Sequence, residues 1–386
     1  MDNIWFASAL WIGLALIASA MQAWVAVSVA LLEIIIGAVA GNLVDLTLTP
    51  WVNYLAGFGA ILLTFLAGAE IDVKVVRRNL GPTMAIGAVG FLAPYLGVLA
   101  YAHFVSGWSW PQAQIAAIAL STTSVAVVYA VMVETGFNQT EIGKIILAAC
   151  FVNDLLTVLA LGLIFANYNL WLVAFAGTTV ITLWLLPRHA PWFFLKIGTR
   201  VSEPQIKFVL LILFLLGGLA NTARSEAVLP AYLIGMVLAP IFLADRELTH
   251  RIRVIAFTVL TPFYFLKAGS LVRADVIVDA AGLIGVYLAV KMITKFVGIL
   301  PLTRIFRFAR REGMYTTLMM STGLTFGSIS ALFGLTNHII DERQYTILLT
   351  AVIGSAVVPT LVAQRWFQPD LKPLVGTAAV KSTLAV

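Results

Sequence analysis

A single carboxylate lies in the middle of a stretch that is otherwise apolar. Residues 144–165 read KIILAACFVNDLLTVLALGLIF, with Asn153 and Asp154 near the centre and no basic residue beside them. About 20 residues of this kind suffice for a helix to cross a bilayer. A carboxylate at that depth costs at least about 2.5 kcal/mol and usually marks a functional site. Asp154 is therefore a candidate site for a proton or a cation. The alternative is a core residue that is hydrogen-bonded to serines and threonines.

Hydroxyl groups in two other apolar stretches could complete a site around this acid. The stretch 112–133 contains Thr122, Thr123 and Ser124, and a second stretch contains STGLTFGS at 321–328. Such runs weaken a helix in mid-membrane and free carbonyl oxygens, which is tolerated where the backbone is buried or lines a cavity. Two interrupted helices in corresponding halves of a chain indicate a transport site built from inverted repeats. Close-packing contacts between helices are the alternative reading.

Further charged residues lie inside the apolar stretches. Lys267, Lys291 and Lys295 all do so, and the last two are four residues apart and so share one helix face. Lys295 is the candidate charge partner of the site, and Lys291 a secondary candidate; both could also be structural counterions. Glu33 and Glu70 are the other candidate acids. We expect a structural role for both, with Glu33 paired to Lys267.

Composition restricts the class of protein. The chain has 386 residues, of which 61% are hydrophobic and 11% charged, whereas soluble domains carry about 25% charged residues. This composition predicts an all-α polytopic membrane protein. The one cysteine and four scattered histidines exclude an intramolecular disulfide and give no metal-ligand spacing. No HExxH motif is present, so we expect neither an enzyme nor a resident cofactor. The N-terminus lacks a signal-peptide pattern, so the first apolar run is expected to be a span.

The spacing of the apolar stretches predicts about 13 spans. They lie near 4–22, 25–44, 52–71, 81–104, 112–133, 144–165, 168–187, 205–222, 228–243, 253–271, 276–300, 313–334 and 344–364. With the N-terminus outside, three of the 24 lysines and arginines lie within spans, three in outer loops and 18 in inner loops. Because basic residues favour the cytoplasmic side, the sequence predicts an outer N-terminus and a cytoplasmic C-terminus in a cell (inner) membrane. This bias of basic residues towards the cytoplasmic side also explains the net positive charge of the chain, so we expect no binding to nucleic acid.

Several motifs together resemble the monovalent cation/proton antiporter superfamily, which includes bacterial sodium/proton antiporters and potassium-efflux systems. The motifs are LLEIIIGAVAGN (31–42), FLAGAEID (65–72), STTSVAVV (121–128), the Asn-Asp pair at 153–154, TPFYFLKAGS (261–270), TKFVG (294–298), GLTFGSISALFGL (323–335) and AVVPTLVAQ (356–364). The resemblance covers about residues 25–368.

The resemblance implies a fold with two groups of helices and a homodimer in the lipid bilayer. Scaffold and dimerisation helices would occupy 1–72 and 205–272, and a moving core 73–166 and 273–368. A linker helix with an interfacial segment would occupy 167–204, and a short cytoplasmic tail 369–386. In such a fold the two interrupted helices cross beside Asp154, which would bind the cation or the proton.

Two positions depart from the family pattern. Many relatives have two adjacent acids where this chain has Asn153 and Asp154. Relatives with an Asn-Asp pair often carry a glutamate one turn earlier that holds the basic residue of the opposite helix, but here that position is Ala149. The resemblance therefore leaves open the partner of Lys295.

The residues predict a mechanism in which a proton and an alkali cation (sodium, potassium or lithium) compete for Asp154. The hydroxyls of Thr123 and Ser124, with the amide oxygen of Asn153, would supply further oxygen ligands. A single acid favours an electroneutral exchange of one cation for one proton. The alternative is a sodium-coupled symporter of a small organic solute on the same helices, which would need two sodium sites. A channel or a membrane-embedded enzyme fits the motifs less well.

Overall fold

The computed structural model describes residues 3–22, 24, 29–44, 46, 48–69, 80–135, 137, 140–165, 169–197, 202–223, 225 and 227–369. Glu70 and the predicted tail from residue 370 onward lie outside these residues. The described residues form helices throughout and no strand, which confirms the all-α prediction.

The helices follow the predicted spans in order. They are α1 (Ile4–Gln22), α2 (Val29–Leu43), α3 (Pro50–Ala69), α5 (Leu80–Ala100) with the π-helical turn η1 (Tyr101–Val105), α6 (Trp110–Ser121), α7 (Val125–Glu134), α8 (Glu141–Ile164), α9 (Leu170–Ile197), α10 (Pro204–Thr222), α11 (Val228–Ala244), α12 (Arg246–Ile255), η3 (Ala256–Leu260), α13 (Thr261–Ser270), α14 (Ala274–Asp279), α15 (Ala281–Ile305), α16 (Arg310–Met319), α17 (Thr325–Thr336) and α18 (Glu342–Trp366).

Nine helices within the described part of the chain are long and apolar enough to cross a membrane. The helices α2, α11 and α17 are apolar but shorter, and the ranges 112–133 and 313–334 are each divided between two helices. The number of 13 spans therefore stays a prediction.

Two predicted boundaries are wrong. The span expected at 276–300 is a short helix, α14, followed at Ala281 by α15, which continues to Ile305. The segment 187–204, expected as a separate interfacial element, begins inside α9, which runs through Pro187 and Pro191 to Ile197. Prolines are tolerated in transmembrane helices, where neighbouring groups satisfy the freed carbonyls. Aromatic and basic side chains still meet at this end of α9, where Lys196 lies over the ring of Trp192.

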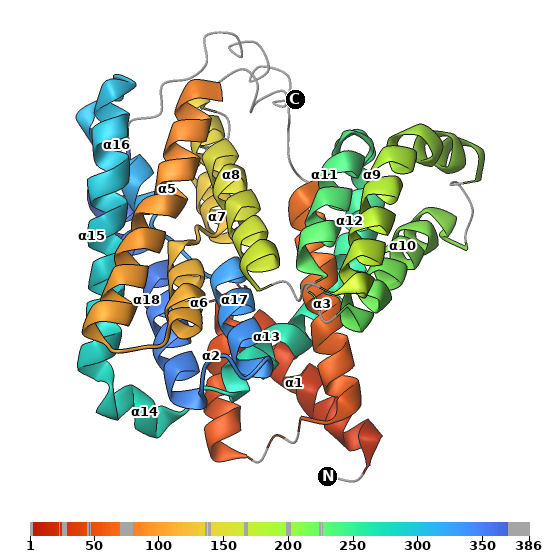
Figure 1. The fold of residues 1–386 in the computed structure, drawn as a ribbon, viewed down its shortest axis with the longest axis horizontal. Helices are drawn as coiled ribbons and strands as arrows, with labels where there is room; N and C mark the ends of the chain where they lie inside the picture. Colours follow the sequence, from red (N-terminus) through yellow and green to blue (C-terminus); the bar gives the residue numbers. More distant parts are fainter. Residues whose placement is uncertain are drawn as a thin grey trace, which may run out of the picture.

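The helices gather in two sets (Figure 1). In that view α5 to α8 lie on the left with α14 to α18, and α3 lies on the right with α9 to α12. The helices α1, α2 and α13 lie low in the view, and α13 packs against both α2 and α3. The boundaries of the scaffold and core domains stay a prediction.

Glycines allow two pairs of helices, α3 with α11 and α2 with α13, to pack at backbone contact. A Cβ atom on Gly68 of α3 would meet the carbonyl oxygen of Tyr232 in α11, and one on Gly235 would meet that of Phe65. The same relation holds between α2 and α13, where a Cβ on Gly269 would collide with the carbonyl of Ile34. Small residues at such positions let membrane helices pack closely. The helix α11 therefore packs closely against α3, and α2 packs closely against α13.

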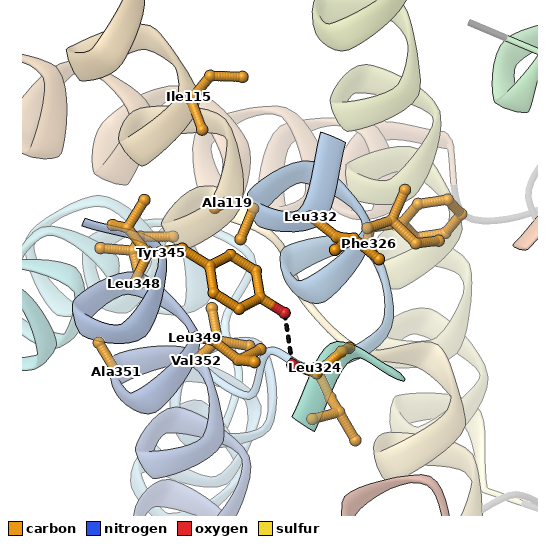
Figure 2. Close-up of a cluster of buried hydrophobic side chains, with 14 of the residues drawn as sticks. Ile115, Ala119, Leu324, Phe326, Leu332, Tyr345, Leu348, Leu349, Ala351 and Val352 are labelled. Atoms are coloured by element: carbon orange, nitrogen blue, oxygen red, sulfur yellow. Dashed lines mark hydrogen bonds between the residues drawn. The ribbon is translucent and has the colours of Figure 1, made fainter. Parts of the chain in front are cut away.

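A buried tyrosine links α18 to α13. Tyr345 of α18 lies among apolar side chains of α6 and α17, including Ala119 and Leu332 (Figure 2). Its hydroxyl donates a 2.6 Å hydrogen bond to the carbonyl of Ala268 in α13. This contact fastens α18 to α13 in the conformation described.

Candidate functional site

The two helix interruptions meet in the middle of the first set. The chain is extended at Thr122 (φ −64°, ψ 153°), between α6 and α7. The amide of Ser124 donates to the carbonyl of Thr322 at 3.1 Å, and the hydroxyl of Thr123 donates to the carbonyl of Met320 at 2.7 Å. Polar groups of the first interruption therefore donate hydrogen bonds to backbone carbonyls of the second. These bonds explain how two unwound segments can be fully buried.

The side chain of Asn153 forms hydrogen bonds with the backbone at the first interruption. Its side-chain oxygen accepts the amide hydrogen of Thr123 at 2.8 Å, and its side-chain nitrogen is 3.4 Å from the carbonyl of Ser121. Both ends of the amide are thus engaged with the backbone at the end of α6. In this conformation the amide bonds the backbone, and the expected role of Asn153 as a cation ligand stays a prediction.

The two lysines of α15 also bind the interrupted segments. Lys295 donates to the hydroxyl of Thr123 at 2.9 Å. Lys291 donates to the hydroxyl of Ser355 at 2.8 Å and to the carbonyl of Thr122 at 3.3 Å. Both lysines are fully buried. The partner of Lys295, which the sequence left open, is therefore a hydroxyl group, and the hydroxyl of Thr123 is occupied as donor and as acceptor.

The carboxylate of Asp154, unlike the side chains of Asn153 and the two lysines, is not fully hydrogen-bonded. Its side chain is buried, at 1% exposure, and its Oδ1 atom has no hydrogen-bond partner. The described residues include no ion pair between Asp154 and either lysine of α15. Buried polar atoms are nearly always hydrogen-bonded, so an unpartnered carboxylate oxygen suits a site where water or an ion can bind.

Asp154 lines a cavity of about 240 Å³ between the two sets of helices. Its lining residues come from α3, α7, α8, α12, η3 and α17, and they are Leu63, Leu66, Ala67, Val125, Tyr129, Asp154, Arg253, Phe257, Thr325 and Phe326. The carboxylate is the acidic group among these residues, and Thr325 adds a hydroxyl. The Asp154 side chain therefore borders open space between the two sets of helices.

Thr325, the first residue of α17, is a candidate site residue that the sequence analysis did not single out. Its hydroxyl is 3.4 Å from that of Ser124, and it lines the same cavity as Asp154. One signal could have identified it, because Thr325 follows the second interruption as Val125 follows the first. In an inverted repeat such positions come together at the crossing.

Two of the remaining candidates, Glu33 and Lys267, do not line the Asp154 cavity. Glu33 is buried in α2 and Lys267 in α13. The expected ion pair between them is wrong, because the described part of the chain includes no contact of this kind between their charged groups. Glu70 lies outside the described residues.

The fold and the site define a class of protein: a secondary transporter with one buried carboxylate at the crossing of two interrupted helices. Comparisons with known proteins agree. The family model described as "Sodium/hydrogen exchanger, transmembrane" matches residues 10–368. This chain belongs to that family.

Curated relatives and solved structures extend the comparison. A protein of Methanocaldococcus jannaschii named probable Na(+)/H(+) antiporter 3 is 25% identical over 353 residues, which are 87% of this chain and 88% of that protein. The Na(+)/H(+)-K(+) antiporter GerN of Bacillus cereus is 22% identical over 334 residues, covering 82% and 84%. The solved sodium proton antiporter MjNhaP1 of M. jannaschii superposes with a TM-score of 0.69 at 12% identity, covering 94% and 98%, and shares the fold.

Proposed function

We propose that this protein exchanges a monovalent cation, sodium or potassium, for a proton, and that Asp154 is the group for which the two compete. The observation that carries the proposal is the buried Asp154 carboxylate, whose Oδ1 lacks a hydrogen-bond partner and which lines a cavity of about 240 Å³. The family and the printed names of the relatives, among them sodium and sodium-potassium antiporters, support the same function.

Burial explains why the two ions would be exchanged one for the other. An ionised carboxylate without a partner is very unfavourable in a low-dielectric interior. Either a proton or a cation neutralises it, whereas the empty charged state is penalised. A carrier with this site would move across the membrane loaded with one or the other, which is the requirement for coupled exchange.

The ligands of the cation would be oxygen atoms around the cavity. Carboxylate, hydroxyl and carbonyl oxygens suit hard cations, and the hydroxyls of Thr325 and Ser124 are the candidates nearest the Asp154 wall of the cavity. Asn153 and Thr123 would hold the interrupted backbone in place. Nothing in the comparisons favours the alternative of a sodium-coupled solute symporter.

Stoichiometry and assembly follow from the same features. With one acid in the site and both lysines of α15 held by hydroxyl and carbonyl groups, we expect one cation to be exchanged for one proton without net charge transfer. We further propose a homodimer in the cell membrane with an outer N-terminus, supported by the asymmetry of basic residues between the loops.

The test uses purified protein in proteoliposomes with an imposed proton gradient and a pH-sensitive dye. Addition of sodium, lithium or potassium salt should dissipate the gradient in the wild type, and the effective salt identifies the cation. Clamping the membrane potential should not change the rate if exchange is electroneutral. Asp154→Asn should abolish the response, and Asp275→Asn, the same change in an exposed acid outside the site, should preserve it. Exchange by the Asp154→Asn protein at the wild-type rate would exclude Asp154 as the shared site.

A further inference from the structure

A second cavity lies between the same two sets of helices, on the opposite side of the crossing. It measures about 130 Å³ and is lined by Asn53, Ala56, Gly57, Ala60, Tyr264, Lys267, Ile329, Leu332, Phe333 and Thr336. Along α3 its lining ends at Ala60, one turn before Leu63 of the Asp154 cavity, and along α17 it begins at Ile329, one turn after Phe326. The two cavities therefore follow one seam and face opposite ends of the helices.

Lys267 distinguishes the second cavity chemically. The side chain is 91% buried, since its exposure is 9%, yet within the described residues its ammonium group makes neither a hydrogen bond nor an ion pair. Lys291 and Lys295, the two buried lysines of α15, each donate to a hydroxyl group. The residues that line this cavity include no acid.

Three polar residues line the same cavity as Lys267. Asn53 contributes an amide group, and Tyr264 and Thr336 contribute hydroxyls, while the remaining lining residues are apolar or small. The Thr336 hydroxyl donates to the carbonyl of Leu332 at 2.9 Å, and the Asn53 amide nitrogen donates one of its two hydrogens to the carbonyl of Leu48 at 3.3 Å. The second amide hydrogen of Asn53, beside a fixed positive charge, suits an anion. The space is ample, because a cavity needs only about 10–15 Å³ to hold one water molecule.

We propose that this cavity binds a small inorganic monovalent anion, for which chloride is the probe, with Lys267 as the counter-charge. A positive charge on a largely buried side chain is unfavourable when no group of opposite charge is near it. An anion drawn from the solution at that end of the helices removes this penalty. The inference does not depend on which ion Asp154 carries.

The position of the site implies that a bound anion affects how the helices are arranged. Lys267 belongs to α13, Ala60 to α3 and Ile329 to α17, so an anion in this cavity would lie between α17 of the first set and α3 of the second, beside α13. The neighbouring residue Ala268 accepts the hydrogen bond from Tyr345 of α18. An anion at this place therefore stabilises the present arrangement of α13 against α17 and α18, and external chloride becomes a modulator of the conformational change.

The experiment measures the thermal midpoint of the purified wild-type protein while chloride replaces gluconate at constant sodium concentration and ionic strength. Binding to the folded state should raise the midpoint with a saturable dependence on chloride. Lys267→Gln should lose this dependence and Lys267→Arg should retain it. Lys207→Gln, which removes an exposed lysine of α10, is the matched control and should respond as the wild type does.

A second measurement keeps the inference testable if Lys267→Gln does not fold. Equilibrium binding of radioactive chloride to the wild type should be saturable, should compete with bromide, and should be retained by Lys267→Arg. A midpoint that is independent of chloride, or a chloride response that survives in Lys267→Gln, would overturn the proposal. Because neither readout involves transport, a negative result here leaves the test of cation/proton exchange unaffected.

Discussion

Thr123→Val is the substitution that best isolates the link between α15 and the crossing. Valine has the shape of threonine but neither donates nor accepts a hydrogen bond. The change removes the hydrogen bond from Lys295 (2.9 Å) and the one to the Met320 carbonyl (2.7 Å). A hydrogen bond to a charged group contributes about 1.5–3 kcal/mol and a neutral one about 1 kcal/mol. We therefore expect the free energy of unfolding to fall by roughly 2–4 kcal/mol.

A double-mutant cycle separates the lysine contact from the rest. The single variants Thr123→Val and Lys295→Met and the double variant are unfolded with denaturant in the same micelles. If the hydroxyl is the partner of the ammonium group, the two changes should couple by about 1.5–3 kcal/mol. Thr123→Ser, which keeps the hydroxyl, is the matched control and should retain most of the coupling with Lys295→Met.

The contrasting hypothesis is that the Thr123 hydroxyl is a cation ligand. In that case Thr123→Val would leave stability nearly unchanged, the cycle would be additive, and the main effect would be a higher KM for the cation. Additive free energies with a raised KM would refute the role that we assign to this residue.

Three further predictions concern other contacts. Asn153→Ala leaves a buried backbone amide without its acceptor, so stability should fall by about 1–3 kcal/mol; an unchanged denaturation midpoint would contradict this. Tyr345→Phe removes the hydrogen bond between α18 and α13 and should lower stability by about 1 kcal/mol while the exchange rate changes; wild-type values of both would count against the contact. The adjacent Arg273 holds the pKa of the Asp275 carboxyl below its usual range. The resulting stabilisation is complete above the usual aspartate pKa of about 3.9 and is lost as the pH falls through the lowered value. Asp275→Asn should therefore flatten the acid side of a plot of thermal midpoint against pH, and an unaltered curve would refute this.

The sequence could predict the helices and the place of the site because these depend on local composition. Apolar stretches of sufficient length require helices in a bilayer, and the runs Thr122 to Ser124 and 321–328 interrupt α6/α7 and α16/α17 as expected. The ends of two elements were missed. The helix α9 continues past Pro187, and α15 begins only after a break at Ala280, because local propensity alone does not determine where these helices end.

The roles of individual polar residues could not be predicted, because they depend on the direction of a side chain at the crossing. Asn153 and Asp154 are adjacent in sequence, yet the amide is bonded to the α6 interruption and the carboxylate lines the cavity. A rotation of about 100° per residue along a helix separates the two. The hydrogen-bond partners of Lys291 are Thr122, between α6 and α7, and Ser355 of α18. Both are far from Lys291 in the sequence, and no sequence pattern indicates that they are its neighbours.

The most direct test of the central claim is proton release on cation binding to the purified protein in weakly buffered detergent solution. If a proton and a cation compete for Asp154, addition of the transported alkali salt should release protons saturably from the wild type, up to one per bound cation. The Asp154→Asn protein should release none, and Asp275→Asn should behave as the wild type does. Equal release from the wild type and from Asp154→Asn would contradict the assignment of Asp154 as the exchange site.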